Sequence, residues 1–469
     1  RAVLLCTTLV YCFLTAAITF GYAPLKPILI QNGFYQGSCH DLDASEEYPE
    51  GQSCPEQVLR LDSMFTIAAA ATHLGALPVG SFLDRFGSKA TGYAGSGLLA
   101  LGAILFPRAS VNLFDAPLVG YVFLALGGRF VFTSSLHLHG LFPKHSNLVG
   151  AFLAGSFDGS SAVFLIFSYF HDSSRVSLEH FFTAYLSVPI FVSLVLFILM
   201  PTQTTSISLI DIGKEDLGDD VACLLPGYES EEDAEIQEKA QGTTTEEYKF
   251  IRLSSEWPRL HRRAAMQQMK TSWFFIPAAF TAVQILRINY TTATIRLQYS
   301  YFLSSKAAAD SLADLYGFAL PLGSLLSIPV SAWVVAQGNI VSIWLIVVSS
   351  GTLVGLIGCL PWELAGTINI WLSVIYAPMF IAALIDYIKC VFGLATMGTI
   401  FGSFLFVSGI VGLIQGPLED LTAVHFENNP LPINMVMTSL TLLLGISLTL
   451  FIFCNTTRKA RSTQVVSTA

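Results

Sequence analysis

Twelve apolar segments, each long enough to cross a lipid bilayer, run through this 469-residue sequence. A spanning helix needs about 20 mainly apolar residues, because lipid offers the backbone no hydrogen-bond partners. Only 12% of the residues are charged, whereas soluble domains carry about 25%. The sequence therefore predicts an all-α polytopic membrane protein. The expected spans are 3–30, 61–83, 90–107, 117–138, 147–170, 180–200, 271–297, 313–336, 340–361, 367–388, 395–417 and 433–454.

A long polar segment separates these spans into two sets of six. Its first part, residues 201–256, holds 14 acidic and 4 basic residues, so it accounts for the net charge of −9. The remainder of the chain is nearly neutral and has no basic footprint, so no nucleic-acid partner is expected. The expected units are an N-terminal six-helix bundle over 1–200, an acidic, largely disordered loop over 201–270, a C-terminal six-helix bundle over 271–455 and a tail over 456–469.

Positive charge predicts the orientation, because loops rich in Lys and Arg stay on the cytosolic side. The short loops on one side contain Arg85, Lys89, Lys144 and Lys389. Both termini and the 201–270 loop are therefore expected in the cytosol, in a monomer embedded in the lipid bilayer. Within that loop, residues 220–225 have acidic dileucine spacing. This spacing favours a vacuolar or lysosomal membrane, and the plasma membrane is the alternative.

A charged turn, residues 84–89, stands between the second and third apolar runs. Gly80 lies one helical turn before it, and Asp84, Arg85 and Gly87 belong to it. The arrangement resembles the signature loop between transmembrane helices 2 and 3 of the major facilitator superfamily. The resemblance implies two six-helix bundles that transport a solute, with these four residues acting in the conformational change. An ordinary charged turn between two spans is the alternative.

Three stretches carry a closer resemblance: Phe20–Leu25, Gly155–Ile166, and the eleventh span with the loop after it, from Ile400 to Met437. The second reads Gly-Ser-Phe-Asp-Gly-Ser-Ser-Ala-Val-Phe-Leu-Ile. It is similar to a stretch of the large neutral amino acid transporters and their equilibrative nucleobase relative (solute carrier family 43), of which the chain resembles a distant, fungal-type member. That family mostly moves leucine-like amino acids passively, but one member carries purine nucleobases. The resemblance therefore leaves the solute open.

Asp158 is an acidic residue near the middle of the span 147–170. An acid at that depth costs about 2.5–3.5 kcal/mol on insertion scales, so it is expected to face a polar cavity and to have a partner. Small residues around it, including Ser161, leave room for a ligand. We predict that Asp158 and Ser161 bind substrate, with the carboxylate meeting an ammonium group, an N–H of a base or a proton. A helix-packing ion pair is the alternative.

Two further spans carry candidate substrate-binding side chains. Arg129 lies mid-span after two glycines and is expected to pair with a substrate carboxylate or with Asp158. Gln284, Arg287 and Thr291 recur at steps of three and four, which places them on one face of a helix. Such a polar face predicts either the lining of a cavity or a polar seam between helices.

The first span carries Gly21 and Tyr22 just before Pro24. We expect the helix to break there and to leave backbone groups available to the ligand, so both residues are predicted to bind substrate. Lys26 follows, and its ammonium group is expected to extend to the outer interface.

Cys39 and Cys54 share the polar loop after the first span. In an oxidising compartment they could form a disulfide, worth about 3 kcal/mol for a loop of this size; two free thiols are the alternative. His137 and His139 would lie on different faces of a helix, and the cysteines show no metal-type spacing. Neither a metal site nor a cofactor is expected.

The sequence favours a transporter over an enzyme, because it contains no phosphate-binding loop and no clustered Ser-His-Asp set. The predicted function is facilitated diffusion of a small polar solute by alternating access at a midplane site. A neutral amino acid is the first choice, and a nucleobase transporter or a proton-coupled symporter is the alternative. A nutrient sensor that keeps the transporter fold and signals through 201–270 is the alternative of another class.

Overall fold

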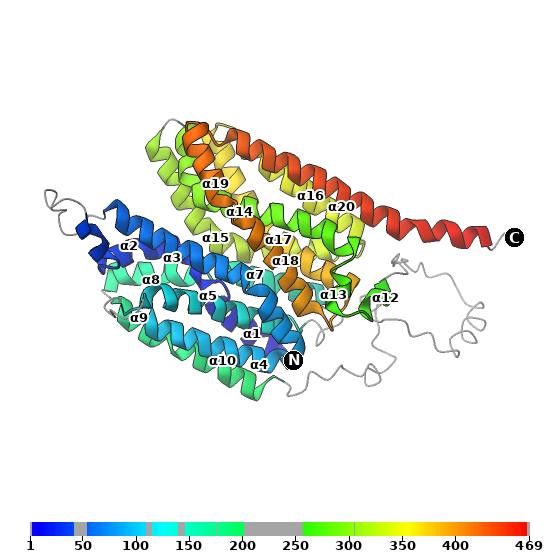
Figure 1. Cartoon of the computed structure of the whole chain (residues 1–469), viewed down its shortest axis with the longest axis horizontal. Coiled ribbons are helices and arrows are strands. Elements are labelled where there is room, and N and C mark those ends of the chain that lie inside the picture. Colours follow the sequence, from blue (N-terminus) through cyan, green and yellow to red (C-terminus); the bar gives the residue numbers. More distant parts are fainter. Residues whose placement is uncertain are drawn as a thin grey trace.

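The computed structural model describes residues 2–41, 54–108, 115–138, 146–174, 176–200, 257–303 and 305–466. Every regular element within these ranges is helical, which confirms the predicted all-α class. The helices of the first half and those of the second half form two bundles that lie side by side (Figure 1).

The two bundles have similar numbers of long helices, several of them broken. The first bundle contains α1 (Ala2–Thr15), α2 (Tyr22–Gln31), α3 (Pro55–Leu74), α4 (Ala76–Leu105), α5 (Ala116–Ser135), α7 (Ser146–Gly159), α8 (Ala162–Ser174), α9 (Leu178–Tyr185) and α10 (Ser187–Ile198). The second contains α14 (Ser272–Leu303), α15 (Lys306–Val335), α16 (Ile340–Ile357), α17 (Glu363–Phe392), α18 (Met397–Gly412), α19 (Gln415–Asp420) and α20 (Leu431–Val466).

Eleven of the twelve expected spans lie in helical runs that are long and apolar enough to cross a membrane, counting the bent pair as one span, and the seventh, α14, does not. Within the described ranges, 9 helical runs are long and apolar enough to cross a membrane, or 10 if the bent pair Val3–Thr15 and Ile18–Gln31 is one span. The second and third expected spans lie in one run, Glu56–Leu105. That run changes direction at Gly87, where φ is 80° and a side chain would be strained. The seventh expected span is α14, which carries the polar face.

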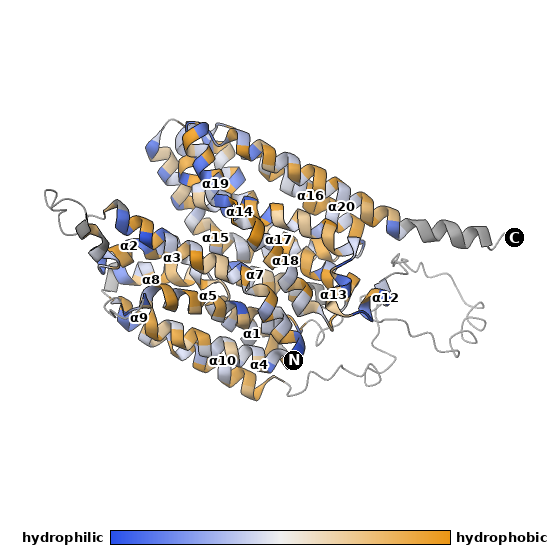
Figure 2. Ribbon diagram, in the orientation of Figure 1, coloured by the Kyte–Doolittle hydropathy of each residue, from blue (hydrophilic) through white to orange (hydrophobic). Residues whose placement is uncertain are grey.

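Apolar side chains cover the outer surface of the bundles, as contact with lipid tails requires. On α10, for example, Ile190, Leu194 and Phe197 are exposed. Figure 2 shows α10 mostly in hydrophobic colours, and hydrophilic residues gather towards the ends of the bundles.

The segment before the seventh span is more ordered than the expected loop. Residues 257–270 include two short helices, α12 (Trp257–His261) and α13 (Ala265–Gln268). The physical reason is burial, because Trp257 and Leu260 are each 4% exposed and the Trp257 ring packs edge-on against Trp273. Residues 201–256, with the dileucine at 220–225, lie outside the described residues, as do Lys144 and His139. The last helix, α20, continues beyond the expected boundary at 455.

The first span is broken, but earlier than expected. α1 ends at Thr15, a 3₁₀ turn covers Ile18–Gly21, and the two helical parts are bent by 45°. Both prolines follow the break, since Pro24 lies in the first turn of α2 and Pro27 inside it. Neighbouring side chains satisfy several of the freed backbone groups.

The break in the first span faces a second break, between α7 and α8. The Ala17 N–H donates to Ser160 Oγ over 2.6 Å, and Ser160 lies in the two-residue gap between those helices. Tyr121 and Tyr185 donate to the carbonyl oxygens of Thr19 and Leu14 over 2.7 and 2.9 Å. These backbone groups are therefore occupied by the protein, contrary to the expectation that the break would offer them to a ligand.

Glycines bring the two bundles into close contact. Residues of α4 pack directly on the start of α18, where a Cβ added at Gly80 would clash with the carbonyl group of Gly398. A Cβ at Gly155 of α7 would lie 2.9 Å from the Ser324 carbonyl oxygen of α15. We call the end of the molecule at which α18 begins, and at which α12 and α13 lie, the α12 end.

The polar loop after the first span is cross-linked, as predicted. Cys39 and Cys54 form a disulfide across a separation of 15 residues. Cys54 is also buried and caps α3, since its sulfur accepts the Gln57 N–H over 3.4 Å.

Replacing Cys39 with Ser is expected to lower the free energy of unfolding by about 3 kcal/mol, because the open loop gains conformational entropy in the unfolded state. The melting temperature of the purified protein in detergent measures this change. Cys359→Ser, which removes a free thiol, is the matched control.

Candidate functional site

The candidate site is centred on two opposite charges beside the breaks. Asp158 lies in the last turn of α7, and Arg129 of α5 is 3% exposed. Their charges are close enough to attract each other electrostatically. No hydrogen bond or ion pair joins the two side chains directly. Instead, Arg129 Nε donates to the Thr72 carbonyl oxygen over 3.3 Å, and the guanidinium carbon lies 5.1 Å from the centre of the Phe157 ring.

Asp158 also faces the second bundle. The α7 helix packs on α15 and α17, and the Asp158 charge acts on the phenol group of Tyr316 in α15. The Tyr316 hydroxyl lies 2.7 Å from Thr292 Oγ1 of α14. Asp158 is half-buried on the helix that packs against the second bundle. Sequence reasoning selected the half-buried Thr291 but missed Thr292 and Tyr316, because the contact depends on how α14 and α15 pack.

His73 in α3 is a second group that the sequence analysis missed. It lies near the positive charge of Arg129, and its ring centre is 6.3 Å from that of Phe20. Neither ring nitrogen has a hydrogen-bond partner among the described residues. A histidine inside the apolar run 61–83 was a visible signal, since ionisable residues at such positions are usually functional.

The polar face of α14 forms a seam inside the second bundle. Gln284 is fully buried, donates to Thr441 Oγ1 over 3.0 Å and accepts from the Tyr376 hydroxyl over 2.8 Å. Arg287 donates from Nη1 to the Gly351 carbonyl oxygen over 2.6 Å and lies over the Tyr376 ring. Its other terminal nitrogen, Nη2, has no partner among the described side chains and backbone groups. The structure thus groups Arg287 with α16 and α17, and apart from the pair Asp158 and Arg129.

Gly21 and Ser161 hold the two helix breaks together. A Cβ at Gly21 would clash with the Ser161 carbonyl oxygen, and Ser161 Oγ donates to the Asp158 carbonyl oxygen over 2.8 Å. Ser161 therefore lies beside the candidate site, but its hydroxyl already donates its hydrogen to a backbone carbonyl at the end of α7. Gly21 supplies close packing. Whether either contacts a solute stays a prediction.

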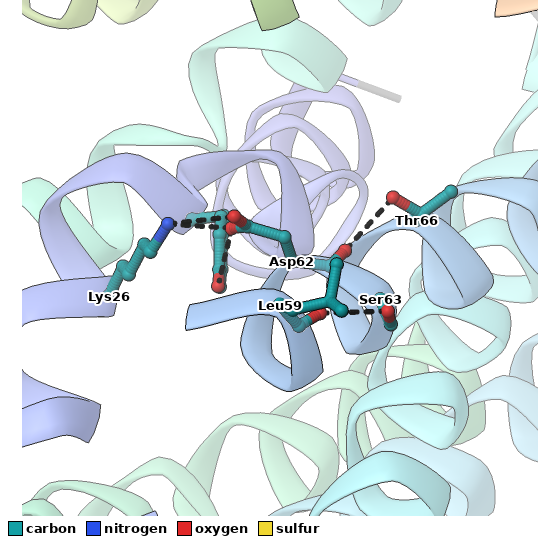
Figure 3. Close-up of polar contacts among 6 residues, drawn as sticks. Lys26, Leu59, Asp62, Ser63 and Thr66 are labelled. Atoms are coloured by element: carbon teal, nitrogen blue, oxygen red, sulfur yellow. Dashed lines mark hydrogen bonds and ion pairs between the residues drawn. The ribbon is translucent and has the colours of Figure 1, made fainter. Parts of the chain in front are cut away.

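Tyr22 points towards the end of the molecule opposite the α12 end. It stacks on Phe65, with ring centres 4.9 Å apart, and its hydroxyl donates to Asp62 over 3.4 Å. Lys26 Nζ lies 2.7 and 3.0 Å from the two carboxylate oxygens of Asp62 (Figure 3). The expected extension of Lys26 to the outer interface stays a prediction, and the structure adds that its ammonium group pairs with a partly exposed carboxylate of α3.

The second bundle has a small cavity at this opposite end, with polar and apolar side chains in its wall. Its volume is about 70 Å³, and Tyr290, Thr294, Gln298 and Glu419 are among the residues that line it. Gln298 joins Thr294 to Asn434 through hydrogen bonds of 2.7 and 2.8 Å. The polar face of α14 therefore continues from the Arg287 seam towards this end of the molecule.

The predicted conformational loop connects the two bundles at the α12 end. Asp84 accepts the backbone N–H groups of Gly398 and Thr399, over 2.9 Å to Oδ1 and 2.7 Å to Oδ2. These N–H groups belong to the first turn of α18, where a carboxylate is favoured by the unsatisfied donors and the helix dipole. Gly80 packs against the same turn and Gly87 forms the bend. Arg85 instead is exposed and lies over the Phe86 ring.

Metal binding finds no support in the described ranges, where no three His, Cys, Asp or Glu side chains gather closely enough to hold an ion. The chemistry available at the candidate site is that of one carboxylate, one guanidinium group and one imidazole in an otherwise apolar setting. Such a set binds charge or hydrogen-bonding groups, or moves a proton.

Comparison with known sequences identifies relatives along the full chain. Protein FMP42 of Saccharomyces cerevisiae is 34% identical over 475 residues, covering 94% of this chain and 93% of that protein. Amino acid transporter 6-1 of Toxoplasma gondii is 23% identical and covers 94% of this chain and 76% of its own. The human large neutral amino acids transporter small subunit 3 is 27% identical over 168 residues, which is 34% of this chain and 30% of that protein. No protein-family model matches the chain.

Comparison with solved structures identifies the fold. The major facilitator superfamily transporter FucP, in its outward conformation, superimposes with a TM-score of 0.57 at 14% sequence identity. The match covers 94% of this chain and 97% of FucP.

Replacing Asp84 with Asn is expected to weaken the contact between α4 and α18, because the helix N-terminus loses an anion worth about 1 kcal/mol. Ser81 and Thr399 have their hydroxyl oxygens 3.5 Å apart across this contact. A Ser81→Cys, Thr399→Cys pair therefore measures the change as the yield of oxidative cross-linking. We expect a yield several-fold lower with Asp84→Asn than without it. The assigned contact is contradicted if Asp84→Asn leaves the cross-linking yield unchanged. It is also contradicted if the exposed control Asp314→Asn lowers the yield as much as Asp84→Asn does.

Proposed function

Because the chain belongs to the major facilitator superfamily, in the family that includes yeast Protein FMP42, we propose that the solute it carries is a neutral amino acid. Transport of a solute across a membrane follows from the family. The finer assignment rests on the candidate site and on relatives that are named as amino acid transporters. The solute would move passively, by facilitated diffusion.

One observation carries this proposal. Asp158 follows Phe157, whose ring centre lies 5.1 Å from the Arg129 guanidinium carbon, and no hydrogen bond or ion pair of the described residues joins the two charged side chains. A zwitterionic amino acid has one ammonium and one carboxylate group, so it can complement both charges at once. A plain sugar has neither charge and would leave both side chains poorly compensated.

Alternating access would use the contacts described above. The two bundles would rock about the region where α7 meets α15 and α17, exposing the candidate site to one side and then to the other. The contact between Asp84 and α18 would stabilise the state that is closed at the α12 end. On this proposal the α12 end and both termini are cytosolic, the protein is a monomer, and its membrane is vacuolar, lysosomal or plasma.

A second candidate, proton-coupled symport, is favoured by His73. This buried imidazole lacks hydrogen-bond partners among the described residues and lies near Arg129. Together with Asp158 it would give the site two groups that can take up a proton. A nucleobase, whose N–H groups could donate to Asp158, is the other alternative, and one relative over about a third of the chain is an equilibrative nucleobase transporter.

Replacing Asp158 with Asn is expected to lower the initial rate of labelled leucine uptake into proteoliposomes about tenfold or more, since a hydrogen bond to a charged group is worth about 1.5–3 kcal/mol. Asp158→Glu keeps the charge and should retain part of the activity. Asp314→Asn removes an exposed carboxylate of α15 and should leave uptake unchanged. Melting temperatures of the purified variants establish that each is folded. Wild-type uptake in Asp158→Asn would remove the assigned role.

An inward proton gradient is expected to leave the final level of leucine uptake unchanged, because a passive carrier only equilibrates its solute. The measurement compares equal pH on both sides with an acidic exterior. If leucine accumulates above its equilibrium level in the gradient, and His73→Gln abolishes this accumulation, the mechanism is proton symport and facilitated diffusion is wrong.

A further inference from the structure

A second cavity lies at the α12 end, away from Asp158. It has a volume of about 360 Å³ and opens between α12, the start of α14 and α20. Its lining includes Arg259, Arg263, Ser272, Trp273, Phe451 and Asn455.

The cavity is positively charged. Arg259 and Arg263 are exposed, and neither forms an ion pair with a carboxylate of the described residues. The sequence from 257 to 309 contains no Asp or Glu at all. Ser272 is the first residue of α14, so the N-terminal end of a 32-residue helix adds partial positive charge and backbone donors. An anion with several acceptor oxygens would satisfy all of these groups.

The depth of the cavity matches the boundary between lipid headgroups and tails. The apolar part of α20 ends at Thr456, and α14 begins its apolar sequence directly after Ser272. Trp273 is buried and Phe451 half-buried in the wall, with their ring centres 4.9 Å apart. Aromatic side chains with an apolar body are typical of this level of the bilayer. The charged part of the cavity therefore lies where the phosphate of a phospholipid would be, and the aromatic part lies where its acyl chains begin.

We propose that this cavity binds the headgroup phosphate of an anionic phospholipid from the leaflet at the α12 end. Arg259, Arg263 and the start of α14 hold the phosphate, and Phe451 contacts the beginning of an acyl chain. The assignment of that leaflet as the cytosolic, anionic one rests on the orientation given under the proposed function. The lipid contact itself does not depend on the solute.

Bound lipid would act on the contact between the bundles through α13. Gln268 of α13 is fully buried and donates from Nε2 to the carbonyl oxygens of Leu260 and Phe392, over 2.8 and 3.1 Å. It also accepts the hydroxyl of Thr396 over 2.7 Å, one residue before α18 begins. The chain segment that supplies the two arginines is therefore tied to the start of α18, where Asp84 binds. A lipid in the cavity stabilises the closed state of the α12 end.

Lipid retention by the purified full-length protein tests the proposal. The protein is delipidated, mixed with phosphatidylinositol or phosphatidylcholine in about 0.15 M salt, where exposed charges are screened beyond about 8 Å, and analysed by native mass spectrometry after buffer exchange. We expect phosphatidylinositol to stay bound to the wild type and phosphatidylcholine to be lost. The double variant Arg259→Gln, Arg263→Gln should retain about tenfold less, because charge-assisted hydrogen bonds are lost.

Arg262→Gln is the matched control, since Arg262 is exposed in the same turn and does not line the cavity. It removes one exposed charge nearby and should leave retention unchanged. Equal loss in Arg262→Gln would show diffuse surface attraction, and undiminished retention in the double variant would place the lipid elsewhere; either result overturns the proposal. Displacement of the lipid by millimolar inorganic phosphate would assign the cavity to a free anion instead. None of these readouts involves solute transport, so a wrong solute leaves them intact.

Discussion

The fold depends on one constraint, that a chain inside lipid must satisfy its own backbone hydrogen bonds. Two of the helices are nevertheless interrupted near the middle of the first bundle, and they solve the problem together. The Ala17 N–H finds a partner in Ser160, which lies in the gap between α7 and α8. Tyr121 and Tyr185 supply donors to carbonyl oxygens of the first span. Each break is stable because the other break and two tyrosines are in place.

The same constraint applies to charge and explains why the ionisable residues lie where they do. Asp158 lies in the last turn of α7, directly before the break between α7 and α8. Arg129 follows Gly128, which lets α5 approach the carbonyl groups of Thr15 and Ala16 closely. The charges of Asp158 and Arg129 thus lie against the broken segments.

The sequence predicted what depends on composition and failed where packing decides. The apolar runs predicted the helices, and the charged turn containing Asp84 predicted the loop at the α12 end. The depth of Asp158 in its span made it a candidate site residue. The break in the first span was expected at Gly21, because proline and glycine are the local signals, but Gly128 and Ser160 from other helices fix it at Ala16 and Ala17. For Arg287 the sequence left a cavity lining and a polar seam between helices open, and the rotation of α14 turns it towards Gly351 and Tyr376 in the seam. No local pattern encodes that rotation.

The two ends of the molecule satisfy their polar groups in different ways, and this difference has a mechanical consequence. At the α12 end, Asp84 and Ser81 of the first bundle bond to Gly398 and Thr399 of the second. At the opposite end, the ion pairs of the described residues stay within one bundle: Lys26 with Asp62, and Arg296 with Asp310. Opening the α12 end therefore requires breaking bonds between the bundles, whereas at the other end these ion pairs can persist through a rocking motion. Among the described residues, the hydrogen bonds of Asp84 and Ser81 to α18 are therefore contacts that a rocking motion would have to break.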